Sequence, residues 1–293
     1  MTTVSQLIEQ ISSHLHNFTG TLEAATYLID DVSDSDTNFL VQHPTKITQG
    51  LVEIDDELLH VDTVGSTSIE MAPYGRGVSG SVAAAHAVNT KVVNDPLFPR
   101  VRIYDAIKRG ILAAQPDLFA VATTEFTSSP VQTTYEIPAA VDRVLKVQYE
   151  MIGPSQEWLT IPYWTIDHNA ATGTGKALVL HTAIQPGRTV QVTYAGRYTS
   201  PTSTSDVLES TCKIPESAHE VLLWYACGQL VQFMELPRLN LRAVEQQARA
   251  QGLQVGDPSK IAAQMFALYE RAKAQERKRL LMTHPPAKRY ATR

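Results

Sequence analysis

The feature that most constrains the fold is the change of hydrophobic periodicity along the chain. Residues 21–93 and 118–200 consist of short apolar segments separated by Asp, Ser, Gly and Pro, a pattern typical of strands joined by turns. Elsewhere, apolar residues recur at intervals of three and four, as on one face of a helix. Strand-rich and helix-rich segments separated in this way predict an α+β fold.

The second strand-rich stretch contains the clearest period-two run of the chain. Val190, Val192 and Tyr194 alternate with Gln191 and Thr193, which predicts a strand with one buried and one solvated face. Several apolar runs lie close together around it. We therefore predict a small antiparallel β-sandwich or barrel in this stretch, and hairpins in the first one.

Helices are predicted from spacing and from start signals. Asp95 before Pro96 predicts a helix that starts there and runs to about Ala114, and Asp257 before Pro258 repeats the signal. The N-terminal amphipathic stripe, whose partner is either the rest of the chain or a neighbouring subunit, consists of Val4, Leu7, Ile8, Ile11, Leu15 and Phe18. The apolar face of the last helix consists of Ile261, Met265, Leu268, Tyr269 and Ala272.

These signals divide the chain into five parts. They are an N-terminal amphipathic helix (1–20), a β-rich domain (21–94), a helical core in two pieces (95–117 and 205–257), a β domain inserted between those pieces (118–204), and a C-terminal helix with a basic tail (258–293).

Charge is distributed unevenly along the chain. The whole chain carries −5, whereas residues 271–293 carry +7, so that residues 1–270 carry −12. The basic residues of this C-terminal segment are Arg271, Lys273, Arg277, Lys278, Arg279, Lys288, Arg289 and Arg293, against the single acid Glu276. This density of positive charge predicts a docking element for an acidic partner surface or nucleic acid, with a solvated helix end as the plainer alternative.

No motif in the chain supports catalysis or a bound cofactor. The segment from Gly173 to Lys176 lacks the first glycine and the following hydroxyl residue of a phosphate loop, so that a hairpin turn is predicted there. Cys212 and Cys227 are too few for a tetrahedral zinc site, and we expect buried free thiols. Because no run of about 18 apolar residues occurs, we expect no membrane span. We expect no enzyme, cofactor or metal site.

Three parts of the sequence together resemble structural proteins of tailed bacteriophages, namely the head-to-tail connector proteins, also called adaptor or neck proteins. The first part is the segment 52–61 (VEIDDELLHV) with the segment 74–86 (YGRGVSGSVAAAH). The second is the strand pair at 135–139 and 187–194, and the third is the helix set at 215–282. The resemblance covers most of residues 45–282 and implies a helical connector core with an inserted β domain.

The resemblance also implies a ring of about twelve copies below the portal protein, in the neck of a virion that is assembled in the host cytoplasm. Such proteins bridge the portal to other neck or tail proteins. They line the channel through which DNA leaves, without binding it specifically, and no membrane is involved. Their C-terminal helix or tail commonly engages the portal, which corresponds here to residues 258–293.

The expected functional residues follow from this resemblance and from the patterns above. The eight basic residues of the C-terminal segment are the expected portal-docking residues. The expected subunit-packing faces are formed by Leu7, Ile11, Ile261, Met265, Leu268 and Tyr269.

Two alternative functions remain open. The chain could be another virion part, such as a tail completion or minor capsid protein, for which three or six copies are expected rather than twelve. It could also be a glycan-binding β-sandwich module, if Trp158, Tyr163 and Trp164 are exposed at strand ends rather than buried in the sandwich core.

Overall fold

The structure is a computed structural model that describes residues 1–19, 23–151, 157–239 and 257–285. It contains both helices and antiparallel sheets, which confirms the α+β class. The chain divides into two compact units. Unit 1 consists of Met1–Leu112, Pro201–Leu208 and His219–Glu270, and unit 2 consists of Ala113–Ser200, Glu209–Ala218 and Arg271–Arg293.

Unit 1 contains a six-stranded antiparallel sheet in the order β1-β6-β3-β4-β5-β2. Its strands are β1 (Ala25–Tyr27), β2 (Asn38–Leu40), β3 (Gly50–Ile54), β4 (Glu57–Val64), β5 (Ser68–Met71) and β6 (Lys91–Asn94). Just beyond the two edge strands, Leu28 and Val41 form an antiparallel bridge. Ile29 N donates to Leu40 O at 2.9 Å beside this bridge. The sheet therefore closes on itself into a small barrel, residues 23–94, which we call the N-terminal barrel.

The interior of the N-terminal barrel is filled by alternate side chains of its strands. The buried cluster consists of Leu28, Val32, Phe39, Val41, Ile47, Val52, Ile54, Leu59, Val61, Ile69, Met71 and Val92. Every strand from β2 to β6 contributes at least one member. Burial of this apolar surface is the main term that favours folding of such a closed sheet.

One buried carboxylate ties the loops of the barrel together. Glu57, at the start of β4, is 1% exposed and accepts five hydrogen bonds. The donors are Arg76 Nε (2.7 Å) and Nη2 (2.8 Å), Gly77 N (3.1 Å), Ala84 N (3.1 Å) and His86 Nε2 (2.8 Å). Because all five donors lie in the segment 74–86, Glu57 fixes the path of this long loop.

The guanidinium of Arg76, like the carboxylate of Glu57, forms five hydrogen bonds. Besides its two bonds to Glu57, its Nη1 donates to Ser33 O (2.9 Å) and Asp36 O (2.7 Å), and its Nη2 donates to Ala84 O (2.6 Å). All five N–H groups of the guanidinium are therefore satisfied. Removing one partner of a buried pair of this kind leaves a buried charge without compensation, which is strongly destabilising.

Two glycines of the same segment, Gly75 and Gly77, lie where a side chain would collide with neighbouring backbone atoms. A Cβ on Gly75 would lie 2.6 Å from His60 O and 2.7 Å from Ala72 O. Gly77 has a φ of +61°, and a Cβ there would lie 2.9 Å from Ala83 N. The sequence YGRG therefore places Arg76 against Glu57 by letting the chain pass close to its neighbours on either side.

Four helices complete the described part of unit 1. They are α1 (Val4–Thr19), α2 (Arg100–Ala114), α3 (His219–Leu239) and the first half of α5 (Asp257–Thr283). Close packing occurs at two glycines: a Cβ on Gly110 of α2 would lie 3.0 Å from Tyr225, and one on Gly228 of α3 would lie 3.3 Å from Phe266 of α5. The aromatic rings of Tyr225 and Tyr269 pack at a centroid distance of 5.3 Å.

One expectation about the helices needs correction. The expected start of α2 at Asp95 and Pro96 is wrong, because α2 begins at Arg100. Asp95 has a φ of +45°, and its N–H donates to Leu51 O, so that it extends the pairing of β6 with β3 instead of capping a helix. The second helical stretch begins at η3 (Glu216–Ala218), which α3 follows directly. The helix expected at 237–251 lies mostly outside the described residues.

Unit 2 contains a four-stranded sheet in the order β10-β9-β13-β7 and a three-stranded sheet in the order β11-β12-β8. The strands are β7 (Ala120–Thr127), β8 (Thr134–Glu136), β9 (Val141–Glu150), β10 (Trp158–Thr160), β11 (Trp164–Asp167), β12 (Ala177–Leu180) and β13 (Thr189–Gly196). One buried cluster takes side chains from both sheets, among them Val144, Trp164, Leu178 and Val192. The period-two run is β13, and the predicted turn at Gly173 joins β11 to β12.

We predict that Gly75→Ala destabilises the protein by about 1–3 kcal/mol, because its Cβ would overlap two backbone carbonyl oxygens that belong to the barrel. Gly65→Ala is the matched control in the same barrel, since its Cβ would come no closer than 3.3 Å to another atom. Urea unfolding followed by circular dichroism measures both. Equal losses of stability in the two variants would contradict the clearance argument.

We also predict that stability falls as the pH rises from 7 to 10, because His86 loses its proton. Burial disfavours its charge, but hydrogen bonds and charges from Asp55 and Glu57 outweigh this and raise the pKa of His86 from 6.5 to about 9. The stabilisation is complete below pH 6.5 and disappears as the pH passes 9, an effect of about 3 kcal/mol.

Denaturant unfolding of the wild type and of His86→Gln at several pH values measures this effect. The variant should be less stable at pH 7 and should show no such decline with pH. The pKa of Glu57 is lowered to about 2, because bonds from Arg76 and His86 overcome the effect of burial, so Glu57 stays ionised throughout this range. A decline of equal size in His86→Gln would rule out the assignment.

Candidate partner interface

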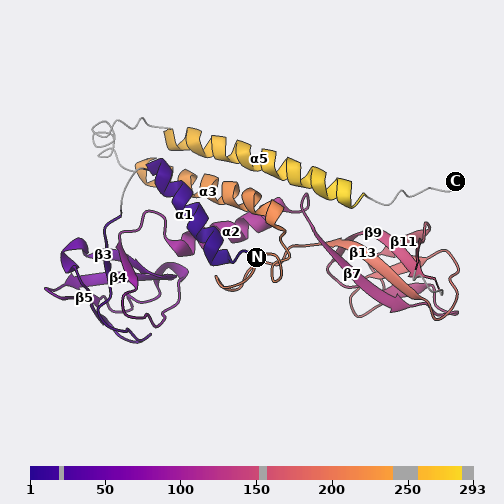
Figure 1. The fold of residues 1–293 in the computed structure, drawn as a ribbon, viewed down its shortest axis with the longest axis horizontal. Helices are drawn as coiled ribbons and strands as arrows, with labels where there is room; N and C mark the ends of the chain where they lie inside the picture. Colours follow the sequence, from indigo (N-terminus) through magenta and orange to yellow (C-terminus); the bar gives the residue numbers. More distant parts are fainter. Residues whose placement is uncertain (20–22, 152–156, 240–256, 286–293) are drawn as a thin grey trace. The chain divides into compact units, whose positions relative to one another are not determined.

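Helix α5 contains every described Lys and Arg of the C-terminal segment. It is one continuous helix, Asp257–Thr283 (Figure 1). The boundary between the two compact units falls inside this helix, after Glu270. Its first half packs on α3 in unit 1, through Phe266 and Tyr269 against Tyr225. Its basic second half, from Arg271 onward, belongs to unit 2.

One side of the basic half is bound to carboxylates within unit 2. Asp117 lies 3.7 Å from Lys273 Nζ and 3.3 Å from Arg277 Nη1. Glu276 is 4% exposed and accepts hydrogen bonds from Ser217 Oγ at 3.1 Å and from Arg279 Nη2 at 2.6 Å. Three of the predicted docking residues therefore neutralise acids of the same chain.

The opposite side of the basic half faces solvent. Arg271, Gln275, Lys278 and Met282 are exposed and follow one another at intervals of three and four, which places them on one face of the helix. Met282 is 72% exposed. Arg271 and Lys278 form no ion pair with another described residue. We call these four residues the outer basic face of α5; the remaining predicted docking residues, Lys288, Arg289 and Arg293, lie outside the described residues.

The six residues predicted to pack between subunits lie in different surroundings. Leu7 and Ile11 are fully buried in unit 1, where α1 contacts α3. Met265 and Tyr269 are 2% and 5% exposed, Ile261 is partly buried, and Leu268 is 39% exposed. The stripe of α1 thus finds a partner inside the chain, and a role of these residues between subunits stays a prediction.

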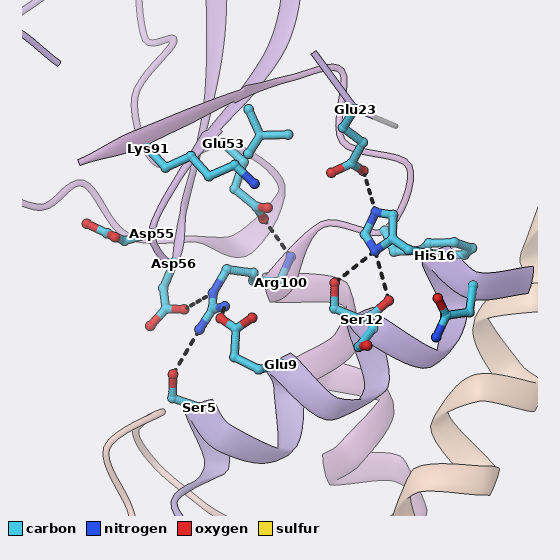
Figure 2. Close-up of a pocket in the computed structure, with 14 residues that line it drawn as sticks. Ser5, Glu9, Ser12, His16, Glu23, Glu53, Asp55, Asp56, Lys91 and Arg100 are labelled. Atoms are coloured by element: carbon cyan, nitrogen blue, oxygen red, sulfur yellow. Dashed lines mark hydrogen bonds and ion pairs between the residues drawn. The ribbon is translucent and has the colours of Figure 1, made fainter. Parts of the chain in front are cut away.

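Unit 1 also has a polar cavity of about 920 Å³ between α1, the N-terminal barrel and the start of α2 (Figure 2). Its carboxylates are Glu9, Glu23, Glu53, Asp55 and Asp56, and its basic side chains are His16, Lys91 and Arg100. A surplus of acids around such a cavity disfavours ionisation of the most buried member.

Arg100 connects the walls of the cavity. Its Nε donates to Asp56 at 2.8 Å, its Nη2 donates to Ser5 Oγ at 2.9 Å, and its Nη1 pairs with Glu9. Its backbone N–H donates to Glu53 Oε1 (Figure 2). Burial lowers and these acids raise the pKa of the Arg100 side chain, with a net increase. Arg100 therefore joins α1, the barrel and α2 as a permanent cation.

Burial, followed by the nearby charges of Glu23 and Asp56, raises the pKa of Glu53 to about 7, although the Arg100 N–H and charge act in the opposite direction.

Sequence reasoning missed this cavity. Glu9, Glu53 and Arg100 lie far apart in the chain, and each belongs to a different predicted segment. The position of Glu53 within an apolar strand was the one available signal.

The structure also shows the surroundings of the cysteines, the aromatic residues and the possible metal ligands. Within the described ranges, no group of three or more His, Cys, Asp or Glu side chains is placed to hold a metal ion. Cys212 and Cys227 are buried thiols outside any disulfide, as predicted, and burial raises the pKa of Cys227 to about 12. Trp164 is part of the sandwich core, whereas Trp158 and Tyr163 are 36% and 46% exposed. None of the described helices is long and apolar enough to cross a membrane.

Comparison with known proteins identifies the family. The family model described as SU10 adaptor protein matches residues 83–282, which include α2, the β-sandwich of unit 2, α3 and most of α5. Residues 52–61 and most of the segment 74–86, which contributed to the resemblance, lie before the matched part. No curated protein matches the chain. The chain belongs to the SU10 adaptor protein family, a family of phage head-to-tail adaptor proteins.

Proposed function

We propose that this protein forms a ring of about twelve copies below the portal, bridges the capsid to the tail, and surrounds the path along which DNA leaves. The observation that carries the proposal is the family match over residues 83–282. A phage adaptor protein is a structural component of the virion, and the described chemistry of this chain suits a structural role. Assembly would take place in the host cytoplasm.

The proposed connector core consists of α2, α3 and α5, with the β-sandwich of unit 2 inserted between α2 and α3. A closed ring repeats one interface between unlike surfaces of adjacent copies. Leu268, which at 39% is the most exposed residue of the apolar stripe of α5, is the best-placed apolar residue for such a contact.

Charge favours passage of DNA rather than a firm grip on it. Residues 1–270 carry −12, and non-specific DNA binding depends on neutralising phosphates with Lys and Arg. A channel wall formed from this part of the chain would release the duplex easily.

The outer basic face of α5 is the proposed contact with the portal or with another acidic neck protein. Lys273 and Arg277 pair with Asp117 of unit 2, and Arg279 pairs with Glu276 of the same helix, whereas Arg271 and Lys278 are exposed to solvent. Exposed charges of this kind steer association and set its salt dependence more than they raise affinity. The alternative, another virion part with three or six copies, uses the same face on a different partner.

We predict that the double variant Arg271→Glu/Lys278→Glu binds the portal of the same virus at least about tenfold more weakly at low salt, because two attractive contacts become repulsive. The matched control is Lys46→Glu/Arg102→Glu, which changes the net charge equally at two exposed positions outside the C-terminal segment. Surface-based binding measurements at several salt concentrations compare both with the wild type. Equal affinities for the two variants would contradict the proposed contact.

A further inference from the structure

Glu53 occupies an unusual place in the N-terminal barrel. Its neighbours in β3, Val52 and Ile54, face the barrel core, so that Glu53 points outward, into the polar cavity beneath α1 and α2 (Figure 2). It is nevertheless only 8% exposed, because these helices cover it. Its Oε1 accepts the N–H of Arg100, the first residue of α2. A barrel carboxylate thus caps the helix on which the barrel rests.

None of the described residues forms an ion pair with this carboxylate. The guanidinium of Arg100 is already bound to Asp56, Glu9 and Ser5, and within the described part of the chain Glu53 receives a hydrogen bond only from the neutral peptide group of Arg100. The titratable and charged groups that face the cavity with Glu53 are Glu9 and His16 of α1, Glu23 before β1, Asp55 and Asp56 of the β3–β4 turn, Lys91 of β6, and Arg100 of α2. His16 Nε2 lies 3.1 Å from Glu23 Oε1.

We propose that a proton controls the contact between the N-terminal barrel and helices α1 and α2, which we call the joint. The barrel is held firmly on the two helices while Glu53 is protonated, and the joint loosens when Glu53 ionises. The protonated carboxyl still accepts the N–H of Arg100 and places no charge in the buried site. The ionised form places a negative charge among Glu23, Asp55 and Asp56, which Arg100 offsets only in part, so that ionisation favours entry of water into the cavity.

The direction in which pH shifts the closed–open equilibrium of the joint follows from the pKa of Glu53 in the two states. The pKa of Glu53 is about 7 in the closed joint, against an ordinary value of 4.5, so the closed joint binds the proton more tightly than the open one. The joint is firmest below pH 4.5, weakens as the pH rises towards 7, and changes little above that value. Between pH 5 and pH 8 the equilibrium between closed and open joint shifts by about 70-fold.

Hydrogen–deuterium exchange of the full chain tests this inference. The reporter is the first turn of α2, and the amides of β4 serve as the internal control for opening of the barrel itself. After correction for intrinsic exchange, protection of the α2 turn should fall by about 70-fold from pH 5 to pH 8. Glu53→Gln should remove this dependence, because the amide oxygen still accepts the N–H of Arg100 but carries no charge. The control His16→Gln should retain it.

Two results would overturn the inference. One is a wild-type α2 turn whose protection is independent of pH, and the other is an unchanged pH dependence in Glu53→Gln. If Glu53→Gln does not fold, Glu23→Gln replaces it. That variant removes a neighbouring negative charge, so the midpoint of the transition should move to lower pH, and an unmoved midpoint contradicts the proposal.

Discussion

The carboxylate of Glu57 supports the N-terminal barrel, because it binds a loop that would otherwise have few apolar contacts. It receives five hydrogen bonds from the segment 74–86. Arg76, which provides two of them, also donates to the backbone oxygens of Ser33 and Asp36. The loop and the turn before β2 are thereby fixed around one buried charge pair. Since Arg100 bonds to Glu53 of β3 and to Asp56 of the β3–β4 turn, the placement of α1 and α2 depends on the same barrel.

Local sequence patterns predicted the elements whose side chains follow one period. The run around Val192 is β13, and the stripe from Leu7 to Ile11 is the buried face of α1. The start of α2 was predicted incorrectly, because Asp95 continues the sheet and the cap comes from Glu53, a residue distant in sequence. The polar cavity could not be predicted, since its walls meet only in the folded chain. Gly75 and Arg76 were noticed as part of a motif, but the need for them appears only in the backbone distances.

The pKa values of the two buried acids of the barrel, Glu57 and Glu53, are shifted in opposite directions. Glu57 is surrounded by donors and has a pKa of about 2, whereas Glu53 receives a single peptide N–H and has a pKa of about 7. Glu57 therefore fastens the barrel internally at any ordinary pH, while the attachment of the barrel to the helices varies with pH. The family match begins at residue 83, so that most of this barrel precedes the matched adaptor part, and its attachment is a property that adaptor chains need not share.

The measurement that tests the adaptor account most directly is electron microscopy, together with mass photometry, of the purified protein mixed with the portal of the same virus. The account predicts a portal that gains a collar of about twelve copies, stacked on the side where the tail attaches. A protein that leaves the portal bare, or that forms trimers or hexamers on another virion component, would contradict it.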